Sequence, residues 1–189
     1  MLFATIFCNA QINIEGLKGW SGEIPTNTYL KDLDDDFQAF VGEFEYNNNG
    51  TTFTIKLIKR TMVPVDGHYE DLLVGEIEYT IQNTNTLVNT MGNINANFPD
   101  PNNHAIISSL IVNNNDFDEC TTCSPNEIGI GASMFDTKRG SEFVFRKITV
   151  GGVPALKIFK RSIAGFVRKN YTVTPPIIPD GEYVFIKIN

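Results

Sequence analysis

Residues 40–46 decide the fold of this chain and read Phe40-Val41-Gly42-Glu43-Phe44-Glu45-Tyr46. Their aromatic residues alternate with Glu43 and Glu45, which is the period of two of a strand with one buried face. An Asn-Asn-Asn-Gly turn at 47–50 leads into residues 51–59, where apolar and polar residues alternate again. We therefore predict that this stretch opens an antiparallel sheet with a β-hairpin.

The motif Val-Gly-Glu-Phe-Glu-Tyr at 41–46 recurs at 74–79 as Val-Gly-Glu-Ile-Glu-Tyr. It does not recur a third time, so it indicates two strands with the same packing problem rather than a solenoid repeat. Gly42 and Gly75 fall on the inward face of these strands. A glycine there permits a bulge or sharp bend, which is how sheets curl toward closure.

Further strands are expected at short intervals along the chain, with Asn-, Gly- and Pro-rich turns between them. They cover residues 105–112, 128–135, 142–150, 155–162 and 183–188. No segment after residue 39 has a helical period. The pattern predicts an all-β fold, an antiparallel meander that is closed or strongly curled into a barrel, with a β-sandwich as the alternative.

The domain plan is a remnant signal peptide at 1–10, a lead-in segment at 11–36 and one β domain at 37–189. An apolar stretch followed by Ala10-Gln11 resembles a signal-peptide cleavage site, although the basic n-region is missing. A lipid anchor on Cys8 is the competing interpretation. We expect export, to the periplasm, the outer surface or the medium. In the lead-in, glycines break any regular period, and acids at 34–36 suit the first turn of a short helix.

Charge excludes one class of partner and suggests another. The formal net charge of −7 argues against nucleic-acid binding, and no apolar run is long enough to span a membrane. Nine basic residues and one acid lie between Lys138 and Lys169. They are either the solvated faces of two strands or a patch for an anionic partner, for which the candidates are Arg146, Lys157, Lys160 and Arg161.

Cys120 and Cys123 form a Cys-Thr-Thr-Cys motif. In an exported protein this predicts a local disulfide, and removal of Cys8 with the leader would leave these two cysteines as a pair. Redox-active thiols and a metal site are the alternatives. His68 and His104, the only histidines, would complete a zinc set, but their spacing matches no zinc module, and both lie in turns where an exposed histidine is common.

The inventory for catalysis is thin. There is no Gly-x-Ser-x-Gly elbow and no phosphate-binding glycine loop before a helix. The acid pairs Glu43/Glu45 and Glu76/Glu78 have the spacing of solvated strand faces. We therefore predict no metal, no cofactor and no catalytic residue.

Four segments carry a resemblance to a family of exported proteins from flavobacteria and other Bacteroidota. They are Asn-Thr-Tyr-Leu-Lys-Asp-Leu at 27–33, Phe-Val-Gly at 40–42, Thr-Phe-Thr-Ile-Lys-Leu at 52–57, and residues 68–76. This family is known only as a domain of unknown function, so the resemblance implies export and no activity. Members often carry Thr-Trp or Thr-Tyr after the glycine, where this chain has Glu43-Phe44.

A second resemblance is to the lipocalin-like β-barrels, and it rests on Gly42 followed two residues later by the aromatic Phe44. The tryptophan that usually closes the floor of such barrels is absent. The resemblance implies a barrel that binds a small ligand inside.

Together these features favour a non-enzymatic, exported binding module for a small apolar ligand or an anionic partner. A hydrolase with a site assembled from loops is the first alternative, and a structural or adhesive surface protein is the second. Binding of a small apolar ligand inside the barrel requires a cavity of about 300 Å³ or more. The patch version requires the four basic residues to share one surface.

Overall fold

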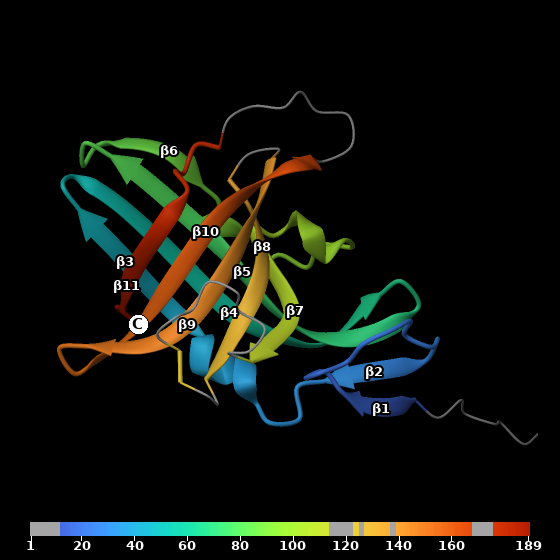
Figure 1. Ribbon diagram of the computed structural model, residues 1–189. Helices are drawn as coiled ribbons and strands as arrows, with labels where there is room; N and C mark the ends of the chain where they lie inside the picture. Colours follow the sequence, from blue (N-terminus) through green and yellow to red (C-terminus); the bar gives the residue numbers. More distant parts are fainter. Residues whose placement is uncertain (1–11, 114–122, 125–126, 137–138, 168–175) are drawn as a thin grey trace, which may run out of the picture.

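The computed structural model describes residues 12–113, 123–124, 127–136, 139–167 and 176–189 (Figure 1). Eight of the described strands close into an antiparallel barrel in chain order, so the predicted barrel is confirmed over the sandwich. The barrel strands are β3 (Gly42–Asn48), β4 (Thr51–Val65), β5 (His68–Ile81), β7 (Ile106–Asn113), β8 (Ile128–Phe135), β9 (Arg139–Val150), β10 (Val153–Val167) and β11 (Gly181–Lys187). Pairing of β5 with β7 and of β11 with β3 completes the closure.

The repeated motif has a structural explanation. β3 and β5 are the two neighbours of β4, and both run antiparallel to it in the same register. Gly42 and Gly75 both pair with Leu57, and the later residues of the two motifs pair with Ile55 and Phe53 in the same way. Two strands that pack against the same residues of a third strand carry the same sequence.

Neighbouring atoms lie too close to Gly42 and Gly75 for a side chain to fit at either position. A Cβ at Gly75 would lie 2.5 Å from Leu57 Cδ2 and 2.7 Å from the Lys56 carbonyl oxygen. Gly42 has φ +143, and a Cβ there would lie 2.7 Å from Lys187 Cε. The prediction that these positions allow the sheet to curl is consistent with their places, because Gly75 pairs with both β4 and β7 where the barrel closes.

Side chains fill the barrel. Twelve inward-facing residues are fully buried: Phe53, Ile55, Leu57, Leu73, Ile77, Ile106, Ile130, Met134, Phe143, Phe145, Ile158 and Phe185. The ring of Phe53 contacts those of Tyr79, Tyr183 and Phe185 at centroid distances of 5.0–5.7 Å. Each large apolar side chain buried in this way contributes about 1.5–3 kcal/mol. Because these residues have no accessible surface, no water-sized void touches them.

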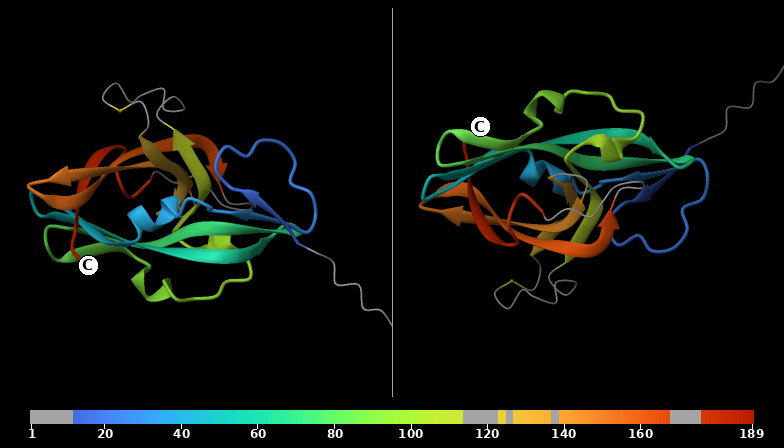
Figure 2. Two further views of the ribbon diagram at one scale, coloured as in Figure 1. Left: turned by 90° about the horizontal axis from the view of Figure 1, so that it is seen from below. Right: turned by 90° about the horizontal axis from the view of Figure 1, so that it is seen from above.

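One end of the barrel, here called the floor, is covered by the 3-10 helix η1 (Asp36–Phe40). It lies at the lower end in Figure 1 and crosses the barrel in the view from below in Figure 2. Its Phe37 and Phe40 are buried, and the Asp32 carboxylate accepts hydrogen bonds from the first two amides of η1, at 2.9 and 3.0 Å. The predicted short helix after the acidic run is thus present, as a 3-10 turn.

At the floor, Lys187 at the end of β11 contacts β3 and the residue before it. Its ammonium donates to the Val41 carbonyl at 3.1 Å and lies 5.6 Å from the centroid of the Phe44 ring. A cation over an aromatic face contributes about 0.5–2 kcal/mol. Phe44, which we placed at the aromatic position of the lipocalin-like motif, is buried at the same point.

The lead-in is more structured than we predicted. It forms β1 (Asn13–Gly16) and β2 (Thr28–Lys31), which extend the sheet beyond the barrel by parallel pairing with β5. The Tyr29 hydroxyl donates to Asp71 at 2.5 Å, and burial together with this carboxylate raises the pKa of Tyr29 to about 12. These strands are hard to recognise in the sequence, because four residues show too little alternation of apolar and polar side chains.

A second excursion leaves the barrel between β5 and β7. β6 (Asn85–Asn89) pairs antiparallel with the last residues of β5, and η2 (Met91–Asn93) and η3 (Pro101–Asn103) follow it, with η2 next to β5 and η3 next to β7 (Figure 2). The Arg60 guanidinium donates to the carbonyls of Ile94 and Ala96, at 3.2 and 2.7 Å, and so ties this excursion to β4. No helix in the described part of the chain is long and apolar enough to cross a membrane.

Substitution of Gly75 by alanine should destabilise the protein by about 1–3 kcal/mol, because the added methyl group overpacks against backbone and a buried leucine. Urea unfolding followed by circular dichroism measures the change. Gly92→Ala is the matched control, since a Cβ at Gly92 meets nothing within 4 Å. Equal stability of the two variants would contradict the role assigned to Gly75.

Candidate functional site

A hollow of about 350 Å³ lies at the floor, between η1 and the adjoining ends of β8 and β9. Its volume is at the lower limit for small-molecule sites. Three apolar residues line it, Ala39, Phe40 and Ile128. Four charged residues complete the lining: Asp35, Asp36, Glu127 and Lys147. We call this feature the floor hollow.

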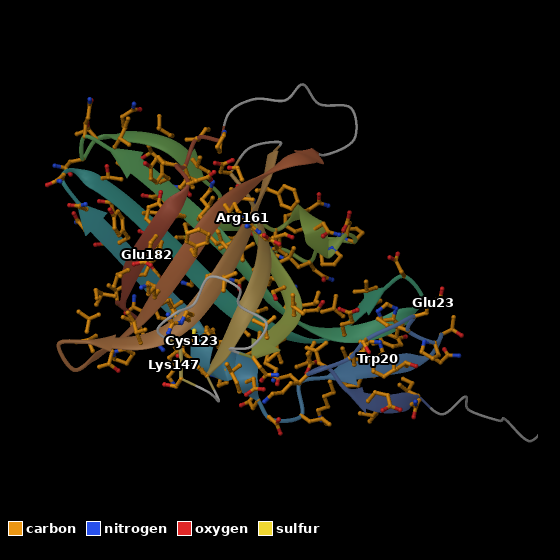
Figure 3. The ribbon with its side chains drawn as sticks, viewed as in Figure 1. Trp20, Glu23, Cys123, Lys147, Arg161 and Glu182 are labelled. Carbon is orange, nitrogen blue, oxygen red and sulfur yellow. The ribbon has the colours of Figure 1, made fainter. Side chains whose placement is uncertain are left out.

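The barrel strands supply two of these residues from inward-facing positions. Side chains alternate along a strand, so Ile128 shares the face of Ile130, and Lys147 shares the face of Phe145. Ile130 and Phe145 are buried inside the barrel, whereas Lys147 is exposed where the barrel ends. Figure 3 shows Lys147 at the lower end of the barrel. The floor hollow is therefore the outer end of the barrel interior.

Each carboxylate of the floor hollow is paired with a cation that does not line it. The nearest nitrogen–oxygen distances are 2.7 Å for Asp35 with Lys59, 3.1 Å for Asp36 with Lys18, and 2.7 Å for Glu127 with Arg146. Hydrogen bonds from Arg146 hold the pKa of Glu127 below its usual value, against the opposing effect of burial, and the Ser124 amide adds to the lowering. Each carboxylate of the lining therefore has a cation partner, although Lys59 is shared with Asp32 and Lys18 with Asp34, so the charge is balanced only in part.

Lys147 differs from the other cations at this end of the barrel. It forms no ion pair and no hydrogen bond with any residue in the described ranges. Its ammonium has three donors. The floor hollow is thus lined by three carboxylates that have cation partners and by one cation that has none among the described residues.

The four basic residues predicted as an anionic-partner patch do not share one surface, which corrects that grouping. Lys160 points into the barrel, is fully buried, and donates to Asp180 at 2.8 Å and to Ser162 at 3.3 Å. The other three face outward, and each is paired with an acid: Arg146 with Glu127, Lys157 with Glu182, and Arg161 with Glu142. Figure 3 shows Arg161 and Glu182 well above the floor.

Both histidines are buried, which corrects the expectation that they are exposed in turns. His68 contacts Glu70 at 2.6 Å, and His104 contacts Glu76 at 2.7 Å. Glu76 has no accessible surface, so it is not part of a solvated strand face as predicted. Phe98 packs edge-on against His104 at a centroid distance of 4.9 Å. The excursion between β5 and β7 creates this burial.

The two histidine–glutamate pairs have the geometry in which a carboxylate orients an imidazole. Among the described residues, no hydroxyl or thiol is hydrogen-bonded to either imidazole ring. The same residues contain no group of three or more side chains that could hold a metal ion. The His104–Glu76 pair attaches the segment before β7 to β5, whereas His68 and Glu70 are both residues of β5.

The cysteine motif lies partly beyond the described residues. Cys120 is outside them, so the predicted Cys120–Cys123 disulfide stays a prediction. Cys123 is described and precedes Ser124, whose amide donates to the Glu127 carboxylate at 3.1 Å. Cys123 is thus four positions before Glu127, which lines the floor hollow.

A family model covers residues 1–187, and its description is "family of unknown function (DUF6705)". The chain belongs to this family. The match agrees with the resemblance to a domain of unknown function, and the closed barrel agrees with the lipocalin-like one. No curated protein and no solved structure matches the chain. Family membership therefore supplies no activity, and the site has to be argued from the structure.

The floor hollow could not be predicted from the sequence, although the acids at 34–36 and the basic residue Lys147 were both noted there. The acids at 34–36 were assigned to a helix start, and Lys147 was one basic residue among nine. Their proximity depends on how η1 packs against β8 and β9, about 90–110 positions away in the chain.

Replacement of His104 by alanine should cost about 3–5 kcal/mol, because it leaves the Glu76 carboxylate buried without its partner. Lys157→Ala, which breaks an exposed ion pair, should cost at most about 1 kcal/mol. Both values come from urea unfolding at neutral pH. A loss for His104→Ala no larger than that for Lys157→Ala would show that the buried pair does not hold the excursion.

Proposed function

We propose that this protein is a non-enzymatic binding module whose ligand site is the floor hollow. The observation that carries the proposal is the packing of the barrel: twelve inward-facing residues of the described chain are fully buried, and a hollow of about 350 Å³ is present at the floor. A small ligand is therefore held at the end of the barrel, against η1, rather than deep inside it.

The lining supports binding more than chemistry. An apolar base with a few polar groups above it is the usual composition of a small-molecule site. The floor hollow combines both kinds of surface, with three apolar and four charged residues in its lining. Neither histidine lines it. A hydrolase would need a nucleophile or an activated water next to an accessible base, and the two buried histidine pairs do not offer this arrangement.

We further propose that the module is exported, with cleavage after Ala10 and a disulfide between Cys120 and Cys123. The apolar leader and the Ala10-Gln11 junction support export, and an oxidising compartment would favour the disulfide.

Intact mass spectrometry of protein recovered from its own host should give a chain that starts at Gln11 and lacks both thiol hydrogens. Reduction should restore these hydrogens. A chain that retains Met1, or free thiols that alkylate without reduction, would overturn export or the disulfide respectively. A lipid-sized mass increase on a chain that starts at Cys8 would favour the anchor instead.

Filling the floor hollow should abolish binding without unfolding the protein. Ala39 lies exposed on η1, so Ala39→Trp places an indole in the hollow, and Gln38→Trp, on the same turn but outside the lining, is the control. Native mass spectrometry after incubation with small molecules extracted from the host culture should show a bound species on the wild type and on Gln38→Trp only. An identical bound mass on Ala39→Trp would exclude the floor hollow.

A further inference from the structure

We propose that the floor hollow binds an uncharged, hydroxyl-rich ligand, of the size of a monosaccharide or a disaccharide unit. This inference rests on the proposed function, because it names the ligand class of the same site. It follows from three properties of the lining: carboxylates that already have cation partners, one ammonium without a partner among the described residues, and three apolar residues.

The carboxylates favour neutral donors. Asp35 and Asp36 each use one oxygen for Lys59 or Lys18, and the other oxygen of each accepts no hydrogen bond from a described residue. An ionised carboxylate has about four acceptor sites, so both residues retain acceptors after pairing. Hydroxyl groups can donate to these acceptors without displacing Lys59 from Asp35 or Lys18 from Asp36.

A cationic ligand fits the carboxylates less well. Next to Asp35 or Asp36 it would meet the ammonium that already pairs with that carboxylate, and the Arg146 guanidinium holds both oxygens of Glu127, at 2.7 and 3.0 Å. Bidentate pairs of this kind are among the strongest in proteins.

An anionic ligand is opposed by the same lining. Lys147 is the one positive side chain of the lining, against three carboxylates. A ligand carboxylate near Lys147 would lie in the field of Asp35, Asp36 and Glu127. A hydroxyl or ether oxygen accepts from the ammonium without that repulsion. Lys147 therefore acts as a hydrogen-bond donor for a neutral acceptor.

The apolar residues complete the match. Ala39, Phe40 and Ile128 provide a base on which the C–H face of a sugar ring can pack. A volume of about 350 Å³ accommodates one or two such rings.

The test compares ligands of one shape and three charges. Saturation-transfer NMR and calorimetry on the full chain use glucose and maltose, glucuronic acid, and glucosamine as probes, with galactose and mannose as further neutral hexoses. We expect at least one neutral sugar to bind, and to bind at least about tenfold more tightly than the charged analogue of the same ring. Its affinity should not change between low salt and about 0.5 M salt, because no net ion pair forms.

Lys147→Met tests the donor while retaining the length of the side chain. It should weaken binding of the neutral sugar about tenfold, as expected for loss of a hydrogen bond from a charged donor. Lys157→Met, which removes a lysine of β10 outside the lining, should bind as the wild type does. Wild-type urea midpoints for both variants would show that the fold is intact.

Two outcomes overturn the inference. Preferential, salt-sensitive binding of the uronic acid or the amino sugar would show that charge selects the ligand. Failure of every sugar to bind would also reject this ligand class. The proposed function fails separately, if Ala39→Trp retains the species bound from the host extract, so the two failures are distinguishable.

Discussion

The absence of a side chain at Gly75, in the middle of β5, is the constraint on which the structure depends. Gly75 pairs with Leu57 on one side and with Ile106 on the other, so it lies where the barrel closes. A Cβ at this position would collide with the Lys56 carbonyl oxygen, which cannot move without breaking the β4–β5 ladder. β5 also pairs with β2 and β6 beyond the barrel. Closure, lead-in and excursion therefore all depend on the path of this one strand.

Closure around large side chains leaves the barrel without an inner cavity at its centre. Phenylalanines from β4, β9 and β11 meet there, and close packing of this kind is the density of a protein interior rather than of a ligand calyx. A hollow of about 350 Å³ lies where η1 meets β8 and β9. The proposed function and the proposed ligand class follow from the position of this hollow at the end of the barrel, where charged side chains lie next to apolar ones.

Much of the fold could be predicted from local pattern. Alternation of apolar and polar residues located the eight barrel strands, since each strand buries one face and leaves the other toward solvent or a covering segment. The identity of the 41–46 and 74–79 motifs was visible, but its cause was not, because it lies in their common partner β4. β1 and β2 were missed because four-residue strands show too little alternation. The floor hollow was missed because it joins residues distant in the chain.

The sequence by itself determined the all-β class, the positions of the barrel strands and the two glycines at which the sheet curls, because these depend on side-chain period and backbone freedom within short segments. Tertiary structure alone decided the environment of each charge. Glu43 and Glu76 occupy equivalent places in nearly identical motifs, yet Glu76 is buried against His104 because the excursion after β6 covers it. Lys160 and Arg161 are neighbours, and one is enclosed in the barrel while the other is exposed. Burial depends on what packs over a residue, which no local pattern records.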